Sequence, residues 1–113
     1  MTVFHSVGFA LEDYDALRIL YEIGTDFEAW LQALRQALDA VRRYGADALV
    51  IALRVDTFEG DPISRFRLRS ADYLRVGEAL ARAGLPTVFV MEGGYAVAAL
   101  GTNVVNALEG FCA

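Results

Sequence analysis

The feature that most constrains the fold is a pair of short, continuous apolar runs in the second half of the chain. They are residues 48–53, ALVIAL, and residues 87–91, TVFVM. Runs of this length and composition are typical of parallel strands that are covered on both faces. Because two parallel strands need a crossover connection between them, the two runs predict a right-handed β-α-β unit.

Helical patterns precede, join and follow the two runs. The first covers residues 26–44, with Thr25 and Glu28 placed to form a capping box and Gly45 placed to end the helix in a left-handed conformation. Its apolar stripe consists of Phe27, Trp30, Leu31, Leu34, Leu38 and Val41. This spacing predicts a helix that buries one face.

The second and third helical patterns follow the first run and the second run. Residues 71–83 follow Ser70, a candidate N-cap, and end at Gly84, beyond which Pro86 prevents the helix from resuming. The last pattern has an apolar stripe formed by Val97, Leu100, Val104, Leu108 and Phe111. The order helix, strand, helix, strand, helix predicts an α/β fold with a small parallel sheet.

The 113 residues fit a single domain, residues 1–113, in which the structure of segment 1–23 is left open between loop and strands at 2–9 and 18–23. No apolar run reaches the roughly 18 residues of a membrane span, and the first ten residues do not resemble a signal peptide. We therefore expect a cytoplasmic protein that does not enter a membrane. Cys112 is the single cysteine, which excludes an internal disulfide.

Charge argues against a nucleic-acid partner. The net charge is −5, with ten arginines and no lysine, and such a chain is repelled by phosphate backbones. The arginines are scattered, apart from an alternating group formed by Arg65, Arg67 and Arg69. In an extended segment these three share one side, which indicates either a solvated loop face or a contact with an anion or an acidic partner.

Candidate chemistry lies directly after the two predicted strands. Ligands of open parallel sheets bind outside the carboxyl ends of the strands, and segments 54–64 and 91–95 both arrive there. If the strands are neighbours, Asp56 and Tyr95 face one crevice. A carboxylate can hold a divalent metal, and a phenol can donate a hydrogen bond to a developing oxyanion.

Two motifs in these segments resemble one known family. Residues 55–64, VDTFEGDPIS, resemble the segment of the histone deacetylase and acetylpolyamine amidohydrolase family that supplies an aspartate ligand to catalytic zinc. Residues 92–95, EGGY, resemble the glycine-rich turn that carries the family's catalytic tyrosine. The likeness covers residues 24–111 and is strongest to the acetylpolyamine amidohydrolase branch. It implies that the chain is a fragment of the deacetylase-type three-layer α/β/α fold.

The resemblance assigns roles to single residues. Asp56 would be a zinc ligand, and Tyr95 would polarise the scissile amide carbonyl. The substrate channel would be bounded by Gly93 and Gly94, and the loop after the first strand would be shaped by Asp61 and Pro62. Composition alone favours a plainer interpretation, in which Asp56 is a loop carboxylate and Tyr95 an aromatic residue at a helix start.

Most of the family's zinc apparatus is missing from this sequence. The family also uses an Asp-x-His pair and a tandem His pair, whereas the only histidine here is His5, in Phe4-His5-Ser6. Zinc is the family's cofactor, but a catalytic zinc takes three protein ligands and a water, so we expect none bound in isolation. Arg54 stands where the family usually has glycine, and we expect it to pair with Asp56 in place of a metal.

Three functions remain open on these grounds. The chain is a truncated relative with little or no amide hydrolysis alone, a subunit of a zinc-dependent amidohydrolase that a histidine-bearing partner chain completes, or a non-catalytic self-association module. We expect a homo-oligomer, because the absence of the rest of an amidohydrolase domain would leave apolar surface in water at about 25 cal/mol per Å².

Overall fold

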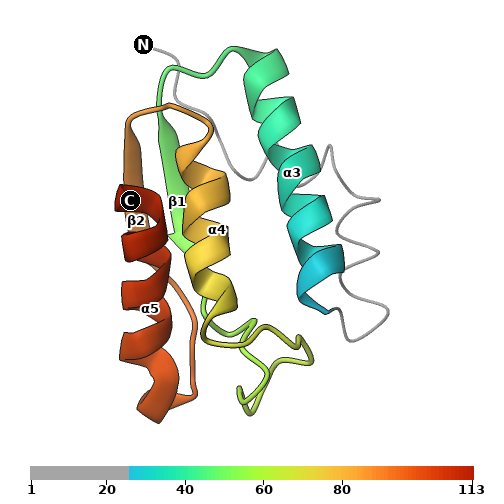
Figure 1. Cartoon of the computed structure of the whole chain (residues 1–113), viewed down its shortest axis with the longest axis vertical. Helices are drawn as coiled ribbons and strands as arrows, with labels where there is room; N and C mark the ends of the chain where they lie inside the picture. The colour runs from blue at the N-terminus through green and yellow to red at the C-terminus, as the bar shows by residue number, and fades with distance from the viewer. Residues whose placement is uncertain (1–25) are drawn as a thin grey trace.

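The computed structural model describes residues 26–113, which form three helices and a two-stranded sheet (Figure 1). The elements are α3 (Phe27–Tyr44), β1 (Leu49–Leu53), α4 (Asp72–Ala81), β2 (Thr87–Met91) and α5 (Val97–Cys112). This order confirms the predicted succession of helices and strands. The alternatives considered for residues 1–23, His5 included, lie outside the described residues.

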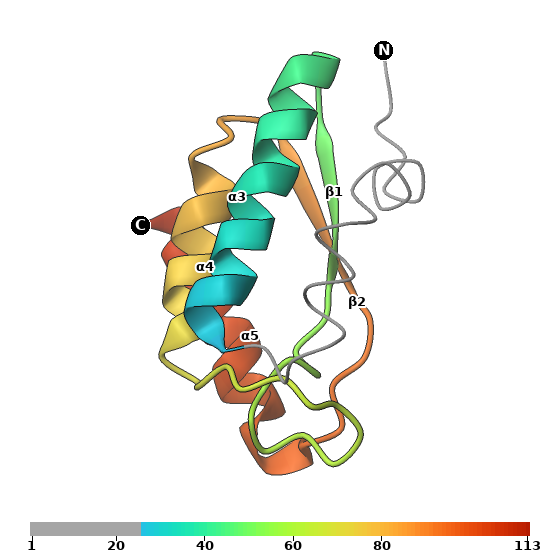
Figure 2. The same cartoon turned by 90° about the vertical axis from the view of Figure 1, so that its right-hand side faces the viewer.

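The two strands pair in parallel, with α4 as the crossover between them. The register runs from Leu49 opposite Thr87 to Leu53 opposite Met91, so both strands end at the same edge of the sheet. All three helices lie on one side of the sheet (Figure 2). This arrangement confirms the predicted β-α-β unit and brings the segments after both strands to one place.

The prediction that both faces of the strands are covered is wrong for the described residues. The face toward the helices is buried, as at Leu49 and Leu53. On the opposite face, Val50, Val88 and Val90 are 44%, 59% and 46% exposed. The described part of the chain therefore has two layers, helices and sheet, and an apolar sheet face without a cover among residues 26–113.

The core lies between the helices and the inner face of the sheet. Side chains from all five elements and from the loop after β1 meet there, and the fully buried ones include Val55, Leu68 and Tyr73. Phe89 of β2 and Phe111 of α5 make an edge-to-face contact with ring centroids 5.1 Å apart. Burial of these groups is what holds the loop after β1 against the helices.

Helix α3 has the predicted stripe but a different cap. Phe27, Leu31 and Val41 are buried, and Gly45 ends the helix with φ 77°, as predicted. Asp26, rather than Thr25, is the N-cap, because its carboxylate accepts a hydrogen bond of 3.0 Å from the N–H of Ala29. A carboxylate three residues before an unpaired N–H is the geometry that an N-cap requires.

Helix α4 also starts differently from the prediction. The side chain of Ser70 makes no capping bond, although its carbonyl oxygen accepts a hydrogen bond from the N–H of Tyr73. The carboxylate of Asp72 instead accepts a bond of 2.7 Å from the N–H of Arg69. The acidic side chain one residue inside the helix thus holds the preceding turn.

The predicted stripe of α5 is partly wrong. Val97 is 82% exposed and Leu108 is also exposed, whereas the buried positions are Asn103, Ala107 and Gly110. The reason is a close approach between two helices: a Cβ atom at Gly77 of α4 would lie 2.0 Å from the backbone oxygen of Ala107. Only small residues fit such a contact, so large apolar side chains lie to its sides.

Candidate functional site

The segments that follow β1 and β2 meet at the carboxyl edge of the sheet. The N–H of Glu92 donates to the carbonyl oxygen of Leu53 (3.1 Å), which extends the pairing past the ends of the strands. A Cβ atom at Gly93 would lie 2.7 Å from Asp56 Oδ2, and one at Gly94 would lie 2.7 Å from Val55 Cγ2. Asp56 therefore lies directly against the glycine turn, as the strand order predicted.

Both glycines have backbone conformations that other residues rarely adopt. Gly93 has φ 70° and Gly94 has φ 114°. A side chain at either position would be strained, and it would also displace Asp56 or Val55. The Gly-Gly pair thus lets the backbone that leads to Tyr95 pass close beside the carboxylate of Asp56.

Asp56 is bound by Arg54. Arg54 Nη2 lies 2.8 Å from Asp56 Oδ2, and Arg54 Nε lies 3.2 Å from the same oxygen. The carboxylate is 15% exposed. Hydrogen bonding to Asp56, followed by its charge, raises the pKa of Arg54, with smaller contributions from Glu92 and Tyr95. The pairing expected from the sequence is confirmed, and a guanidinium is the cation that Asp56 holds.

Asp61 joins the two segments through backbone hydrogen bonds. Its Oδ1 accepts from the N–H of Ile63 (2.9 Å) and of Ser64 (3.1 Å), and its Oδ2 accepts from the N–H of Tyr95 (2.9 Å). Burial alone would raise the pKa of this carboxyl, which is 6% exposed, but the backbone N–H donors outweigh it and the pKa is lowered. Pro62, within this turn, is exposed.

Tyr95 has a fixed backbone and an open side chain. Asp61 holds its N–H, while the residue is 49% exposed at the start of the segment that leads into α5. The phenol is near enough to Arg54 to contribute to that residue's raised pKa. The structure therefore brings Arg54, Asp56 and Tyr95 to one edge, with the phenol open to solvent.

A buried hydrogen-bond pair beneath the site was not identified in the sequence. Thr57 Oγ1 and Tyr73 Oη are 2.9 Å apart, and Tyr73 Oη also donates to the carbonyl oxygen of Val55 (3.3 Å). Burial is the main cause that raises the pKa of Tyr73 to about 12. Tyr73 thus connects α4 to the backbone of Val55 and to the side chain of Thr57, the residues on either side of Asp56. A tyrosine on the buried face of α4, with a hydroxyl that needs a partner, was the available signal.

The described residues do not fit a catalytic zinc. Three protein ligands are the usual set, and Asp56 is one carboxylate whose Oδ2 is already bound by Arg54. In the part of the chain from residue 26 onward, no three His, Cys, Asp or Glu side chains come close enough to hold a metal ion. A cation that bound Asp56 through Oδ2 would have to displace this guanidinium.

The fold and the site identify the class to which this protein belongs. The histone deacetylase domain matches residues 5–111, and the chain is a member of that family. Its helices and parallel strands are part of the deacetylase-type α/β fold. Among residues 26–113, no helix has both the length and the apolar composition of a membrane span.

Within the family, the chain is most clearly similar to acetylpolyamine amidohydrolases. Acetylpolyamine amidohydrolase 2 of Pseudomonas aeruginosa is 58% identical over 88 residues, which are 78% of this chain and 26% of that protein. Acetylpolyamine amidohydrolase of Mycoplana ramosa is 48% identical over 87 residues, 77% of this chain and 26% of that protein.

A solved structure agrees with these relatives. The crystal structure of acetylpolyamine aminohydrolase from Burkholderia pseudomallei superposes with a TM-score of 0.77 at 34% identity. The match covers 80% of this chain and 26% of that chain. The present chain thus spans about a quarter of the length of the relatives it matches.

Proposed function

We propose that this chain carries the Asp56 and Tyr95 side of an acetylpolyamine amidohydrolase-type site, and that the 113 residues do not hydrolyse acetylated amines by themselves. The observation that supports this proposal is the ion pair between Arg54 and Asp56, at 2.8 Å. Asp56 is the one zinc ligand of the family that we recognise in the sequence, and this ion pair places a guanidinium on it where the family has zinc.

Two requirements of amide hydrolysis argue for the same conclusion. To bind Asp56, a zinc ion would have to displace Arg54 and would gain one protein ligand. Tight zinc sites supply three. Water must also be activated by a general base, and the sequence has one histidine, His5, outside the family's tandem pattern. Tyr95 could polarise an amide carbonyl, but a phenol alone supplies no nucleophile.

A zinc titration of an Arg54→Gly variant tests the role of Arg54. The variant restores the family's usual residue and frees Asp56, so we expect weak but measurable zinc binding, whereas the unaltered chain binds none. Arg65→Gly is the matched control, because Arg65 is an exposed arginine of the same loop and makes no contact with Asp56. Negligible affinity in both variants would count against the proposed role of Arg54.

Completion by a partner is the second candidate for the same site. Tyr95 and the glycine turn lie at an exposed edge, where another polypeptide could supply the missing histidines. In that case, zinc and hydrolysis of acetylputrescine appear only in the mixture of the chain with its histidine-bearing partner. Turnover that is the same with and without the partner would exclude this candidate.

Self-association is a third candidate, and the sheet face that residues 26–113 leave uncovered favours it. Val50 pairs with Val88 and Ala52 pairs with Val90 on this face, so the four side chains form one apolar patch. We expect a Val88→Glu variant to shift the chain toward monomer in a dilution series followed by analytical ultracentrifugation. Val105→Glu is the control, because Val105 is a similarly exposed valine on α5. A compact monomer at all concentrations for the unaltered chain would refute the association.

A further inference from the structure

A cavity lies at the end of the molecule opposite to Asp56. It has a volume of about 540 Å³ and lies between α3 and α4. Gly45 and Ala46, which precede β1, and Leu85, which precedes β2, also line it. The cavity is therefore at the amino ends of the strands, whereas Asp56 follows a carboxyl end, so the two sites are separate.

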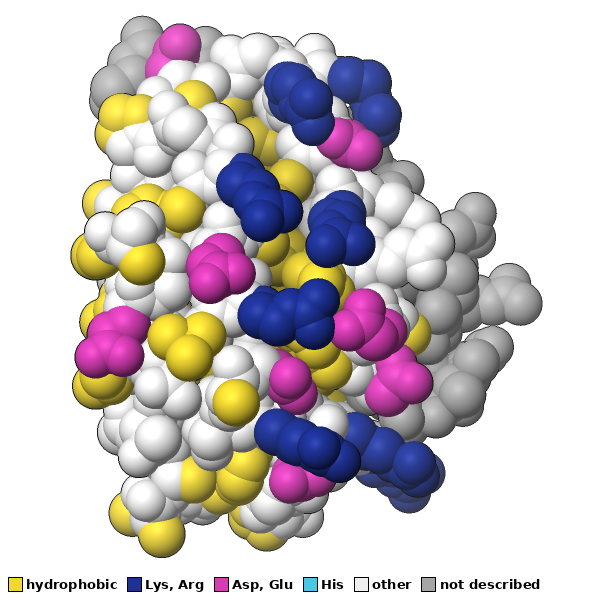
Figure 3. Space-filling model, in the orientation of Figure 1, with side chains coloured by type: hydrophobic (Ala, Val, Ile, Leu, Met, Phe, Trp, Pro, Cys, Tyr) yellow, Lys and Arg dark blue, Asp and Glu magenta, His cyan; other side chains and the backbone are white. Residues whose placement is uncertain are grey.

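The rim of this cavity is basic. Three arginines line it, Arg35 and Arg42 from α3 and Arg82 from the end of α4, against one acid, Asp39, which leaves a net charge of +2. Figure 3 shows arginine side chains gathered along the seam between α3 and α4. This concentration of positive charge occurs on a chain whose net charge is −5.

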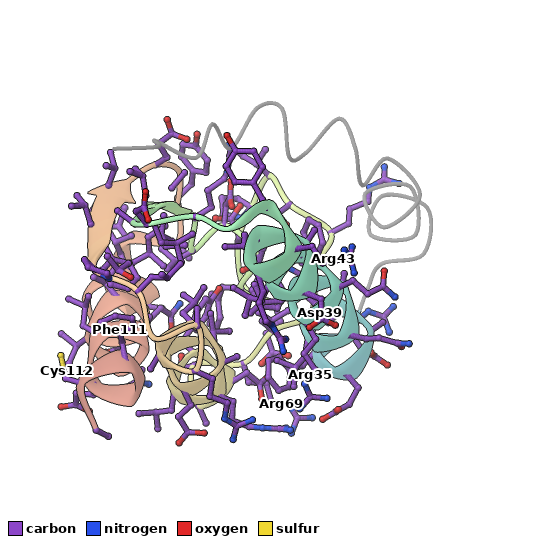
Figure 4. The ribbon with its side chains drawn as sticks, turned by 90° about the horizontal axis from the view of Figure 1, so that it is seen from above. Arg35, Asp39, Arg43, Arg69, Phe111 and Cys112 are labelled. Carbon is purple, nitrogen blue, oxygen red and sulfur yellow. The ribbon has the colours of Figure 1, made fainter. Side chains whose placement is uncertain are left out.

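Two of the three guanidinium groups make no ion pair with an acid of the described part of the chain. Asp39 pairs with Arg42, one turn further along α3. Within residues 26–113, neither Arg35 nor Arg82 makes an ion pair. Figure 4 shows Arg35 and Asp39 on the side of α3 that faces α4. Arg35 and Arg82 thus face the same cavity without an ion pair to a described acid, although Glu78 lines the adjoining hollow beside them.

Helix stabilisation accounts for only part of this pattern. Arg42 is in the last turn of α3, and Arg82 is the C-cap of α4, where cations complement the helix dipole. Arg35 lies in the middle of α3, more than two turns before Tyr44, and the dipole effect is confined to the last turn. Because Gly45 and Ala83, at the carboxyl ends of α3 and α4, also line the cavity, both helix dipoles oppose a bound anion and the arginines have to outweigh them.

The floor of the cavity is apolar. Leu38 and Val41 come from α3 and Ala79 from α4, and both Val41 and Ala79 are buried. A ligand that fits this surface has an apolar body against the floor and an anionic group between the arginines at the rim. The volume lies within the range of about 300–1,000 Å³ that is usual for small-molecule sites.

We propose that this cavity binds a small organic phosphate monoester. At neutral pH such a group carries about −1.5 to −2 charges, which matches the net charge of the rim. Its oxygens accept paired hydrogen bonds from guanidinium groups, the geometry for which arginine is suited. The apolar part of the ester covers Leu38, Val41 and Ala79, which inorganic phosphate cannot do.

Calorimetric titration of the complete chain with phenyl phosphate at low salt tests the proposal. We expect saturable binding of one molecule per chain, weakened about tenfold by Arg35→Gln or Arg82→Gln and further by the double variant, as expected for the loss of charge-assisted hydrogen bonds. Arg65→Gln removes the same charge from an exposed loop position and should bind as the unaltered chain does. Arg35 and Arg82 are both exposed, so the variants should fold, and circular dichroism checks that they do.

The ligand series separates the parts of the proposal. Inorganic phosphate should bind about tenfold more weakly than phenyl phosphate, because it buries no apolar surface. Phenol should not bind detectably. Absence of saturable binding by the unaltered chain, equal binding by the double variant, or equal affinity for inorganic phosphate and phenyl phosphate would each overturn the proposal.

Discussion

Replacement of Asp61 by asparagine tests how the candidate site is held together. In the structure, this carboxylate accepts three backbone hydrogen bonds, two within its own turn and one from Tyr95. Oδ1 accepts the bonds from the N–H groups of Ile63 and Ser64, and Oδ2 accepts the bond from the N–H of Tyr95. An amide retains one oxygen only, so at least one backbone N–H would face an NH₂ group.

The size of the effect follows from these bonds. Leaving one buried donor without an acceptor costs about 1–3 kcal/mol, and the remaining bonds lose the extra strength that a charged acceptor provides. We therefore expect Asp61→Asn to lower the free energy of unfolding by about 3 kcal/mol, which at about 4 °C per kcal/mol is a fall in Tm of roughly 12 °C for a chain of this size.

Asp26→Asn is the matched control in urea and thermal unfolding. Asp26 also accepts a backbone N–H, but from one donor and through one oxygen, and asparagine caps helices about as well as aspartate. The control should change the free energy of unfolding by less than about 0.5 kcal/mol. Amide hydrogen exchange should also quicken at Tyr95, Ile63 and Ser64 in the Asp61 variant and not in the control.

The pH dependence gives an independent check. Because folding lowers the pKa of Asp61, its charged form stabilises the fold above the ordinary pKa of 3.8, and this stabilisation is lost as the pH falls below that value. The unaltered chain should therefore lose its advantage over Asp61→Asn in acid. The reasoning is refuted if Asp61→Asn costs no more than Asp26→Asn, or if the difference between the two chains does not shrink in acid.

Substitutions of Gly77 and Tyr73 test the helix packing and the buried hydrogen bonds. Gly77→Ala puts a Cβ atom 2.0 Å from the backbone of Ala107, and we expect at least about 3 kcal/mol of destabilisation in urea, whereas Gly101→Ala, in open space on α5, should stabilise by about 0.5–1 kcal/mol. Equal effects would contradict the close contact. Tyr73→Phe should cost about 1–2 kcal/mol through its lost bonds. Because folding raises the pKa of Tyr73 from 10 to about 12, the unaltered chain should lose stability between these pH values, and Tyr73→Phe should lose less.

The parts of the fold that depend on periodicity could be predicted from the sequence. The stripe of α3 indicates a helix, and the two apolar runs indicate strands. Two parallel strands joined by a helix favour a right-handed β-α-β unit. The stripe of α5 differs from the prediction because a periodicity pattern weighs large apolar side chains. The contact with α4 selects small residues instead, as at Ala107 and Gly110, and a sequence pattern does not contain the distance between two helices.

The sequence predicts where the candidate site lies in the fold, but not the hydrogen bonds that hold it together. The positions of Asp56 and Gly93 follow from two strands that end at one edge, and the Arg54 pairing follows from charge at a separation of two residues. The bond from Asp61 to Tyr95 spans 34 residues, and it depends on how the loop after β1 turns back. The arginine-lined cavity likewise lies between α3 and α4. The residue spacing within one helix does not show which residues of the other helix lie opposite, so the sequence does not predict it.

Zinc content and amide hydrolysis, measured together on the purified 113-residue chain, test the central claim most directly. With Arg54 bound to Asp56 and a single histidine in the sequence, we expect far less than one zinc per chain after dialysis against the metal and no release of acetate from acetylputrescine. One tightly bound zinc per chain, with acetate release that a chelator abolishes, would contradict the account.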